Sequence, residues 1–313
     1  MSAKKCLIID AMHESLFPML AEIGWEFDYQ PQITPETIKN IHAHYQGLIV
    51  RSKVQINREL LGENPTVKFI GRAGAGLDNL DLEYLTEKGI RVLHAAEGNR
   101  DAVGEYTLGA LLALMRNLPK ADREVKEMIW DREGNRGEEL GEKTVGIIGY
   151  GNMGQAFAKR LSGFGCKVLA YDKYKTGFTD HFVREVEMNE IYDECEVVSL
   201  HIPLTDETRG LVDKHYWSRF KNKIILINTA RGEIVLLADV LQALDSGLLR
   251  GAVLDVLENE KLDKLTSSQR QTFNSLKKKS NVILTPHIAG WTFESHVKIN
   301  VALVKGIKSL HLR

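Results

Sequence analysis

Six short apolar runs at regular spacing in the second half of the chain set the strongest limit on its fold. They cover residues 145–148, 168–171, 197–200, 224–227, 252–254 and 282–284, and are rich in Val, Ile and Leu. The segments between them have room for a helix. Strands that alternate with helices form a parallel sheet covered on both faces. We therefore expect one doubly wound parallel sheet.

A second series of runs precedes these, at residues 6–9, 48–50, 68–70 and 91–93. At about 150 residues per domain, a chain of 313 residues makes two domains. A helical stretch over residues 101–116 and a charged, glycine-containing segment up to Lys143 would connect them. We predict an α/β protein with two Rossmann-like or flavodoxin-like domains and a cleft between them. Residues 1–98, completed by 289–313, form the first, and residues 99–288 form the second.

Composition excludes several classes of protein. The 41 Lys and Arg residues against 42 Asp and Glu leave a net charge of −1, which provides no broad attraction to nucleic acid or acidic lipid. Three cysteines, odd in number and far apart, predict free thiols rather than a disulfide or zinc framework. The apolar stretch over residues 106–115 is about half a membrane span, and the run over residues 6–9 is too short for a signal peptide. We expect a cytoplasmic protein without a metal, a membrane partner or a nucleic-acid partner.

A glycine motif follows the first strand of the second series. The motif Gly149-Tyr150-Gly151-Asn152-Met153-Gly154 leads into a segment with apolar residues at helical spacing. The first glycine permits a tight turn, the second lets the backbone approach a pyrophosphate, and the third allows close packing of helix on strand. The free N–H groups of the helix start, at Asn152 and Met153, suit phosphate oxygens. This context predicts a dinucleotide site.

An acidic residue at the end of the next strand indicates which dinucleotide binds. The carboxylate of Asp172 can accept hydrogen bonds from the hydroxyl groups of the adenosine ribose, and it would repel a 2′-phosphate. NAD is therefore favoured over NADP. Lys173 and Lys175 leave NADP open, because either could reach a phosphate.

Polar residues follow three other strands of the second series. They are Arg231, then Asp255 and Glu260, and finally His287. Since ligands of open α/β sheets bind at the carboxyl ends of the strands, these side chains would share one edge. A guanidinium binds a carboxylate through two hydrogen bonds, an imidazole transfers protons near neutral pH, and a neighbouring carboxylate orients it. The set predicts a site for reduction of a 2-oxo acid. Alternatives are an ion pair between Arg231 and Glu233 and a helix cap at Asp255.

Several motifs in order resemble the D-isomer-specific 2-hydroxyacid dehydrogenase family over nearly the whole chain, and within it the D-3-phosphoglycerate dehydrogenases. Beside the glycine motif they are Arg51-Ser52, the run 74–78, Asn99 with Glu105, the run 201–205 with Thr208, the run 228–232, Asp255-Val256 with Glu260, and the run 285–290.

The resemblance implies roles for these residues. Arg231 would hold the substrate, His287 would transfer the proton, and Glu260 would bind His287, while hydride passes to or from NAD. Residues beside the cofactor would be His201, Pro203, Thr205, Thr208, Thr229 and Asp255. Residues facing the substrate from the first domain would be Arg51, Ser52, Lys53, Gly74, Ala75 and Gly76. The family also implies a homodimer, formed through the helical crossing and the segment around Trp130.

The substrate stays open between 3-phosphoglycerate and hydroxypyruvate, glyoxylate or another small 2-oxo acid. A phosphorylated acid needs further cations, for which Arg51, Lys53, Arg72 and Arg100 are candidates. Trp291 is a candidate wall of the substrate site.

The sequence departs from the family pattern at two places: Lys261 replaces the usual proline after Glu260, and Glu97 lies in a segment that commonly has a proline. No regulatory domain, and hence no serine feedback, is expected. A corepressor-like protein that senses NAD(H) is the alternative to an enzyme.

Overall fold

The computed structural model describes residues 4–310 and divides the chain into two compact units. Unit 1 comprises Met1–Arg100 and Trp291–Arg313, and unit 2 comprises Asp101–Gly290. Both borders lie two residues after the predicted ones. The long helix α5, Ala96–Met115, carries the chain across the first border.

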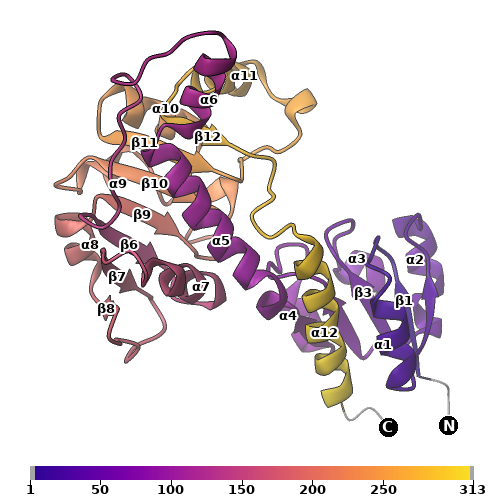
Figure 1. Ribbon diagram of the computed structural model, residues 1–313. Helices are drawn as coiled ribbons and strands as arrows, with labels where there is room; N and C mark the ends of the chain where they lie inside the picture. The colour runs from indigo at the N-terminus through magenta and orange to yellow at the C-terminus, as the bar shows by residue number, and fades with distance from the viewer. Residues whose placement is uncertain (1–3, 311–313) are drawn as a thin grey trace. The chain divides into compact units, whose positions relative to one another are not determined.

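Unit 2 contains a sheet of seven parallel strands in the order β12-β11-β10-β9-β6-β7-β8 (Figure 1). The strands are β6 Thr144–Ile148, β7 Lys167–Tyr171, β8 Val183–Glu185, β9 Val197–Leu200, β10 Ile224–Asn228, β11 Leu249–Leu254 and β12 Val282–Leu284. From β6 onward this is the 3-2-1-4-5-6 order of a dinucleotide-binding sheet with one strand added. The six predicted strands are confirmed. The structure adds β8, an edge strand with a single apolar residue and hence no detectable pattern.

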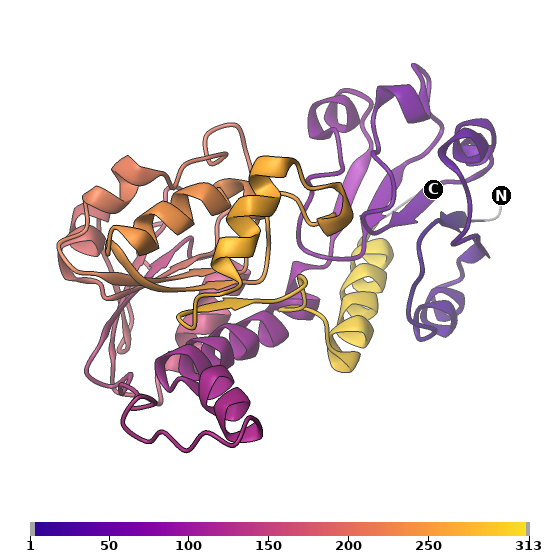
Figure 2. The same cartoon turned by 90° about the horizontal axis from the view of Figure 1, so that it is seen from above.

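Helices cover both faces of this sheet (Figure 2). On one face, α5 and α7 (Asn152–Leu161) bury Leu111, Phe157 and Leu161 against Val145, Ile227 and their neighbours. On the other face lie α8 (Met188–Glu194), α9 (Lys214–Ser218), α10 (Leu237–Asp245) and α11 (Ser267–Leu276). Helix α6, Leu118–Lys126, has no buried residue. Burial on both faces explains why the central strands β6, β9 and β10 are almost continuously apolar.

Unit 1 contains five parallel strands in the order β2-β1-β3-β4-β5, the flavodoxin-like order. The strands are β1 Lys5–Ile8, β2 Glu26–Tyr29, β3 Gly47–Val50, β4 Phe69–Arg72 and β5 Arg91–His94. The helices are α1 Leu16–Glu22, α2 Pro35–Ile41, α3 Arg58–Leu61, α4 Leu82–Glu87 and α12 Phe293–Ser309. The four predicted strands are confirmed, and β2 is added. It is an edge strand in which charged and aromatic residues alternate, so it forms no apolar run.

Helix α12 returns the chain to unit 1 and completes its core. Ile299, Leu303 and Ile307 pack there with residues of β1, β4 and α1. The start of α5 passes close by, since a Cβ on Gly98 would lie 2.5 Å from the backbone of Ile299. Glycine is therefore required at position 98 by close helix packing.

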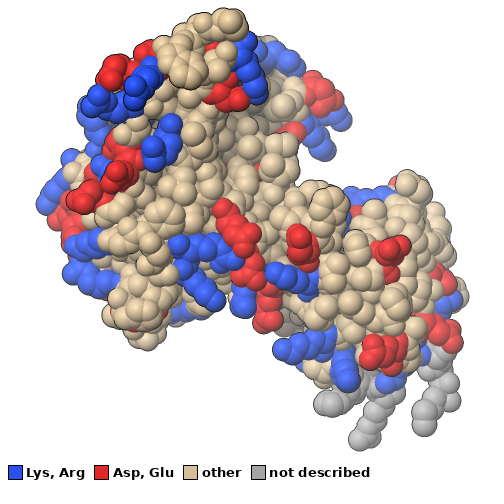
Figure 3. All heavy atoms as spheres, in the orientation of Figure 1, with Lys and Arg blue, Asp and Glu red and all other residues tan. Residues whose placement is uncertain are grey.

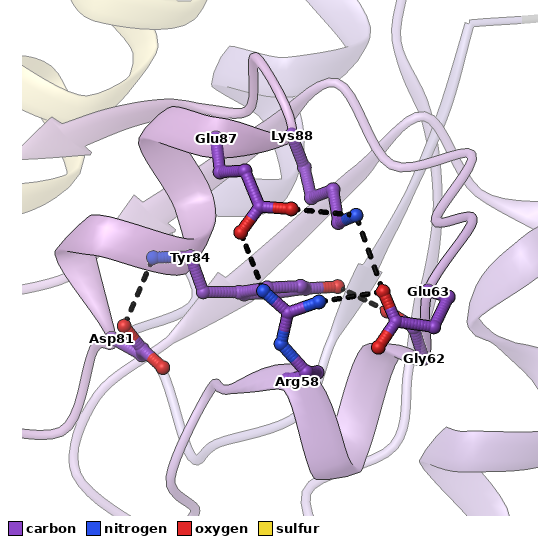
Figure 4. A network of polar contacts seen from close by, with 7 residues as sticks. All are labelled: Arg58, Gly62, Glu63, Asp81, Tyr84, Glu87 and Lys88. Carbon is purple, nitrogen blue, oxygen red and sulfur yellow. Dashed lines mark hydrogen bonds and ion pairs between the residues drawn. The ribbon is translucent and has the colours of Figure 1, made fainter.

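An exposed network of charges joins α3 to α4 on the surface of unit 1 (Figure 4). The Arg58 guanidinium donates to Glu63 and Glu87, each at 2.5 Å, and its carbon lies 5.1 Å from the centre of the Tyr84 ring. Charges of both signs are also interspersed on the face of the molecule drawn in Figure 3. None of the helices in residues 4–310 is long and apolar enough to cross a membrane.

A second network ties the long segment after α6 to the sheet of unit 2. Glu138 accepts hydrogen bonds from Arg250 on β11, at 2.5 Å, and forms an ion pair with Lys143, at 2.8 Å. The Arg250 side chain is only 24% exposed. The hydrogen bonds from Arg250 and Lys143 lower the pKa of Glu138 to about 2. Ion pairs thus fix the segment between α6 and β6, which forms no helix or strand.

We predict that Glu138→Gln lowers the free energy of unfolding at pH 7. Because the carboxylate is 48% exposed, the loss should be only about 1 kcal/mol. A carboxyl group with a lowered pKa stabilises the fold above its unfolded pKa, and the contribution disappears as the pH falls towards 2. Urea unfolding at pH 7 and pH 3 should therefore show a smaller difference between variant and wild type at pH 3. Glu139→Gln, at an exposed position next in sequence, is the control and should change neither value.

Candidate active site

The loops that follow β6, β9, β10, β11 and β12 lie at one edge of the unit 2 sheet, since all of these strands are parallel. This edge carries the glycine motif and the four polar residues singled out in the sequence. Strands β6 and β9 are neighbours in the sheet, with the later strands on one side and β7 on the other. That is the point where strand order reverses, and where open α/β sheets bind their ligands.

The glycine turn after β6 is built by close backbone contacts. Gly149 has φ +94°, and a Cβ there would lie 2.4 Å from the carbonyl oxygen of His201. A Cβ on Gly154 would lie 2.1 Å from the carbonyl oxygen of Gly149. Gly151 differs, because no atom of residues 4–310, apart from its own chain neighbours, lies within 4 Å of the position that its Cβ would occupy. The fold itself thus requires Gly149 and Gly154, whereas at Gly151 the open space over the start of α7 suits an approaching phosphate.

The Asp172 carboxylate holds the glycine turn in place. One oxygen accepts a hydrogen bond from the backbone N–H of Tyr150 at 2.7 Å, and the other accepts from the N–H groups of Tyr174 and Lys175. Of the two lysines that left NADP open, Lys173 forms an ion pair with Glu207. The amine of Lys175 donates to the carbonyl oxygen of Tyr150 at 3.4 Å.

The segment after β9 is shaped by its own side chains. The His201 side chain is partly buried, and its Nε2 lies 2.8 Å from the Ser199 hydroxyl. Burial lowers the pKa of this imidazole to about 4. Thr208 donates from its hydroxyl to the carbonyl oxygen of Pro203 and accepts from the N–H of Thr205. These side chains bond to the loop itself. Backbone groups of the segment, more than its side chains, would therefore contact a cofactor.

The turn after β10 presents Arg231. Asn228, buried at the strand end, accepts from the N–H of Ala230 and donates to the carbonyl oxygen of Arg231. A Cβ on Gly232 would lie 1.9 Å from the carbonyl carbon of Leu257, so glycine is required there. The hydroxyl oxygen of Thr229 is buried without a hydrogen-bond partner. Asn228 and Gly232 therefore fix the backbone of this turn, and Nη1 of Arg231 donates to the carbonyl oxygen of Ala230 at 2.6 Å.

His287 and Glu260 are brought together at this edge. Nδ1 of His287 lies 2.9 Å from Oε1 of Glu260, and both side chains are about half exposed, at 48% and 49%. The hydrogen bond from His287 lowers the pKa of Glu260, with smaller contributions from the charges of His287 and Arg231. Since a carboxylate only accepts, Nδ1 carries the proton and Nε2 remains for a substrate.

Asp255 is almost fully buried and clamps the loop that carries His287. Its carboxylate accepts from the Thr285 hydroxyl at 2.6 Å and from the N–H groups of Ile288 and Ala289 at 2.9 and 2.8 Å. Its backbone carbonyl accepts from the N–H of His287 at 2.7 Å. Asp255 therefore caps no helix. It determines the course of a neighbouring loop instead.

Hydrogen bonds hold the segment after Glu260, in which Lys261 replaces the proline usual in the family. Asn259 accepts from the N–H of Lys261 at 3.1 Å and donates to the carbonyl oxygen of Lys264 and to the side chain of Gln269. The side-chain amide of Asn259 thus fixes the loop at Lys261, where the family usually has a proline. Nothing in the residue type of Asn259 alone indicated this role.

In unit 1, the predicted substrate residues follow β3 and β4. Asp10, after β1, accepts from the backbone N–H of Arg51 at 2.6 Å, and the Arg51 guanidinium lies 4.4 Å from the centre of the Trp291 ring. The His296 ring packs edge-on against Trp291 with its Nε2 buried and unpaired. These side chains form a cationic and aromatic cluster at the carboxyl edge of the unit 1 sheet. His296 was not predicted, because a single histidine in the first turn of a helix carries no signal of its own.

The other candidate cations of unit 1 either donate to backbone carbonyl groups or are exposed. The Lys53 amine donates to the carbonyl oxygens of Pro31 and Ile33, at 2.8 and 2.7 Å, so it serves the local backbone. Arg72 donates to the carbonyl oxygen of Ala73 and lies 2.1 Å from the position of a Cβ on Gly74. Arg100 and Glu97 are exposed. Ser52 is exposed, while Ala75 and Gly76 are partly buried.

Comparison with known proteins identifies the family. The model of the NAD-binding domain of D-isomer-specific 2-hydroxyacid dehydrogenases matches residues 108–289, more than half of the chain. The chain belongs to this family. Unit 2 is thus its NAD-binding domain, and the open space over Gly151 and the unpaired hydroxyl of Thr229 fit a bound dinucleotide.

Individual relatives of this dehydrogenase family match both units. The D-3-phosphoglycerate dehydrogenase of Archaeoglobus fulgidus is 33% identical over 308 residues, which are 98% of this chain and 57% of that protein. The chain thus spans little more than half the length of this relative. The hydroxypyruvate reductase of Thermotoga maritima is 36% identical over 83% of each chain. The crystal structure of D-lactate dehydrogenase from Aquifex aeolicus with NAD and lactic acid has a TM-score of 0.83 at 28% identity, covering 97% of this chain and 94% of that one.

We predict that Asp172→Ser weakens NADH binding, because a charged hydrogen-bond acceptor is lost. The ratio of the NADPH to the NADH dissociation constant should also fall by roughly tenfold, because the charge that repels a 2′-phosphate is removed. Asp172→Asn separates the two effects, since it keeps one acceptor oxygen but not the charge. Quenching of intrinsic fluorescence measures both affinities. Asp193→Asn, at an exposed position on α8, is the control. An unchanged preference in both Asp172 variants would contradict a ribose role for Asp172.

Proposed function

We propose that this protein is an NAD-dependent D-2-hydroxyacid dehydrogenase, with Arg231, Glu260 and His287 as its catalytic residues. The observation that carries the proposal is the bond from Nδ1 of His287 to Glu260, within reach of the charge of Arg231. A carboxylate that fixes the tautomer of an imidazole, beside a guanidinium for an anionic substrate, is the arrangement that proton transfer to a 2-oxo acid requires.

In the proposed reaction, Arg231 binds the carboxylate of the 2-oxo acid through two hydrogen bonds and so orients its carbonyl group. His287, protonated, donates from Nε2 to the carbonyl oxygen, and Glu260 stabilises the imidazolium through Nδ1. Bound NADH supplies the hydride that reaches C2. The chain's own task is to place the substrate and move one proton. In the oxidative direction, His287 accepts the proton from the hydroxyl group.

For the substrate, we propose 3-phosphoglycerate and its 2-oxo acid, with hydroxypyruvate and glyoxylate as the alternatives. Support comes from relatives named D-3-phosphoglycerate dehydrogenase that align with 98% of this chain. The Arg51 cation and the backbone of Gly74, Ala75 and Gly76 would serve the rest of the substrate. Lys53 is withdrawn as a phosphate ligand, since its amine serves two backbone carbonyl groups.

We also propose that the protein is a homodimer in the cytoplasm. An exposed apolar patch, which we call the α6 patch, lies on α6 and the residues after it. Its members are Leu118, Val125, Met128, Ile129 and Trp130, with Met128 92% and Trp130 78% exposed. Exposed apolar patches favour association, and a second copy of the chain is the partner that the family implies. Free Cys6, Cys166 and Cys195 support a reducing compartment.

We predict that His287→Asn lowers kcat by at least about 100-fold, because the proton donor is lost. Asparagine tolerates the left-handed backbone of this position, φ +56°, so the loop should keep its shape. The assay follows NADH absorbance with 3-phosphohydroxypyruvate, hydroxypyruvate, glyoxylate and pyruvate, alongside NADH binding. His215→Ala, an exposed histidine on α9, is the control. Wild-type protein that binds NADH but turns over none of these acids would favour the NAD(H)-sensing alternative.

We predict that Trp130→Glu combined with Met128→Glu converts a dimer to a monomer, because two charges would enter an apolar interface. Light scattering after size-exclusion chromatography should give twice the 35.3 kDa of one chain for the wild type and 35.3 kDa for the variant. Leu82→Glu, an exposed leucine of α4, should leave the mass unchanged. A dimer that survives the double substitution would place the interface elsewhere.

A further inference from the structure

We propose that Tyr106 is a positioning residue for His287, acting through a chain of hydroxyl groups that holds the His287 loop. Tyr106 lies on α5, the helix that covers one face of the unit 2 sheet. Its hydroxyl bonds the hydroxyl of Thr285, which bonds the buried carboxylate of Asp255. The inference rests on the proposed function, because it gives His287 the catalytic role.

The direction of this chain follows from its end. An ionised carboxylate has no proton to donate, so the Thr285 hydroxyl must donate to Asp255. Its single proton is then used, and the Tyr106 hydroxyl must donate to the Thr285 oxygen. Burial raises the pKa of Tyr106 to about 12, so its hydroxyl remains a donor throughout the neutral range. The rotamer of Thr285 is therefore fixed from both sides.

This chain matters for His287 because the loop from Thr285 to Ala289 is otherwise unfavourable. His287 has φ +56°, a left-handed conformation that is unfavourable for a residue with a side chain. Hydrogen bonds to a charged group are stronger than those between neutral groups. Asp255 accepts three such bonds, from Thr285, Ile288 and Ala289, and these hold the loop in this conformation. Thr285 is the first residue of the clamped loop, and Tyr106 is the group that orients its hydroxyl.

A packing role for Tyr106 would depend on the ring, whereas the proposed role depends on the hydroxyl. The ring packs beside a cluster of buried residues that includes Leu111 and Val253. Phenylalanine keeps this packing and removes only the donor. At Thr285, serine keeps the hydroxyl, while valine keeps the shape without it. These substitutions separate the two roles.

We expect Tyr106→Phe to lower kcat roughly 5- to 20-fold with the NADH dissociation constant unchanged, because the imidazole is less well held rather than absent. Thr285→Val should lower kcat about 100-fold, and Thr285→Ser should stay close to the wild type. The double variant Tyr106→Phe/Thr285→Val should be no slower than Thr285→Val alone, since both changes break one chain. Thr107→Val is the control, because among the described residues the Thr107 hydroxyl bonds the carbonyl oxygen of Val103 within α5 and no part of the His287 loop.

A second readout works without turnover and separates this inference from the proposed function. In protein labelled with 13C-histidine, the ring signal of His287 is assigned by its loss in His287→Asn. It should shift or broaden in Tyr106→Phe and stay in place in Thr107→Val. An unmoved signal with unchanged kcat would overturn the role of Tyr106 while leaving the proposed dehydrogenase intact. A moved signal in a protein that turns over none of the acids would uphold the positioning chain and reject the activity.

Discussion

The buried carboxylate of Asp255 is the group on which the geometry of the site depends. It lies at the end of β11, is 1% exposed, and accepts hydrogen bonds from three residues of the loop after β12. A charge this deep in a protein is tolerated only when it is fully hydrogen-bonded. The loop meets this requirement and is in turn held in a left-handed conformation at His287. Burial of the carboxylate and placement of the imidazole are thus one structural feature.

The cofactor side of the same edge depends on contacts between backbones rather than on charge. Gly149 and Gly154 let β6, α7 and the segment after β9 approach to distances at which any Cβ would collide with a carbonyl oxygen. Asp172 then binds the N–H of Tyr150 and closes the turn. Within residues 4–310, Gly151 is the glycine of the motif without a neighbour that excludes a side chain, so a constraint on it would come from a ligand. In one motif, therefore, two glycines are required by the fold, and we propose that binding requires the third.

The parallel strands and their order of appearance could be predicted because a buried parallel strand is apolar along its whole length. The edge strands β5 and β12 were also predicted, because each contains two or three consecutive apolar residues. The edge strands β2 and β8 were not, because charged and aromatic residues alternate in β2 and β8 has a single apolar residue. The candidate catalytic residues were predictable from strand ends and from the family resemblance. The residues that hold them were not predicted. Asn228 and Asn259 act through hydrogen bonds to nearby residues, which the residue type alone does not indicate. Tyr106 bonds a residue 179 positions away, for which one sequence carries no pattern.

Two carboxylates lie beside His287, and their environments suit different tasks. Asp255 is buried and bonds the backbone of the His287 loop, whereas Glu260 is half exposed and bonds the ring at Nδ1. The Asp255 carboxylate accepts three hydrogen bonds from one loop and bonds no atom of the His287 ring in residues 4–310, so it fixes the geometry of the loop. A carboxylate open to solvent stabilises the imidazolium and still lets the ring be reprotonated between turnovers. The proposed reaction needs both arrangements. If Asp255 were exposed, the His287 loop would be held less firmly, and if Glu260 were buried, the His287 ring would lose its access to protons from solvent.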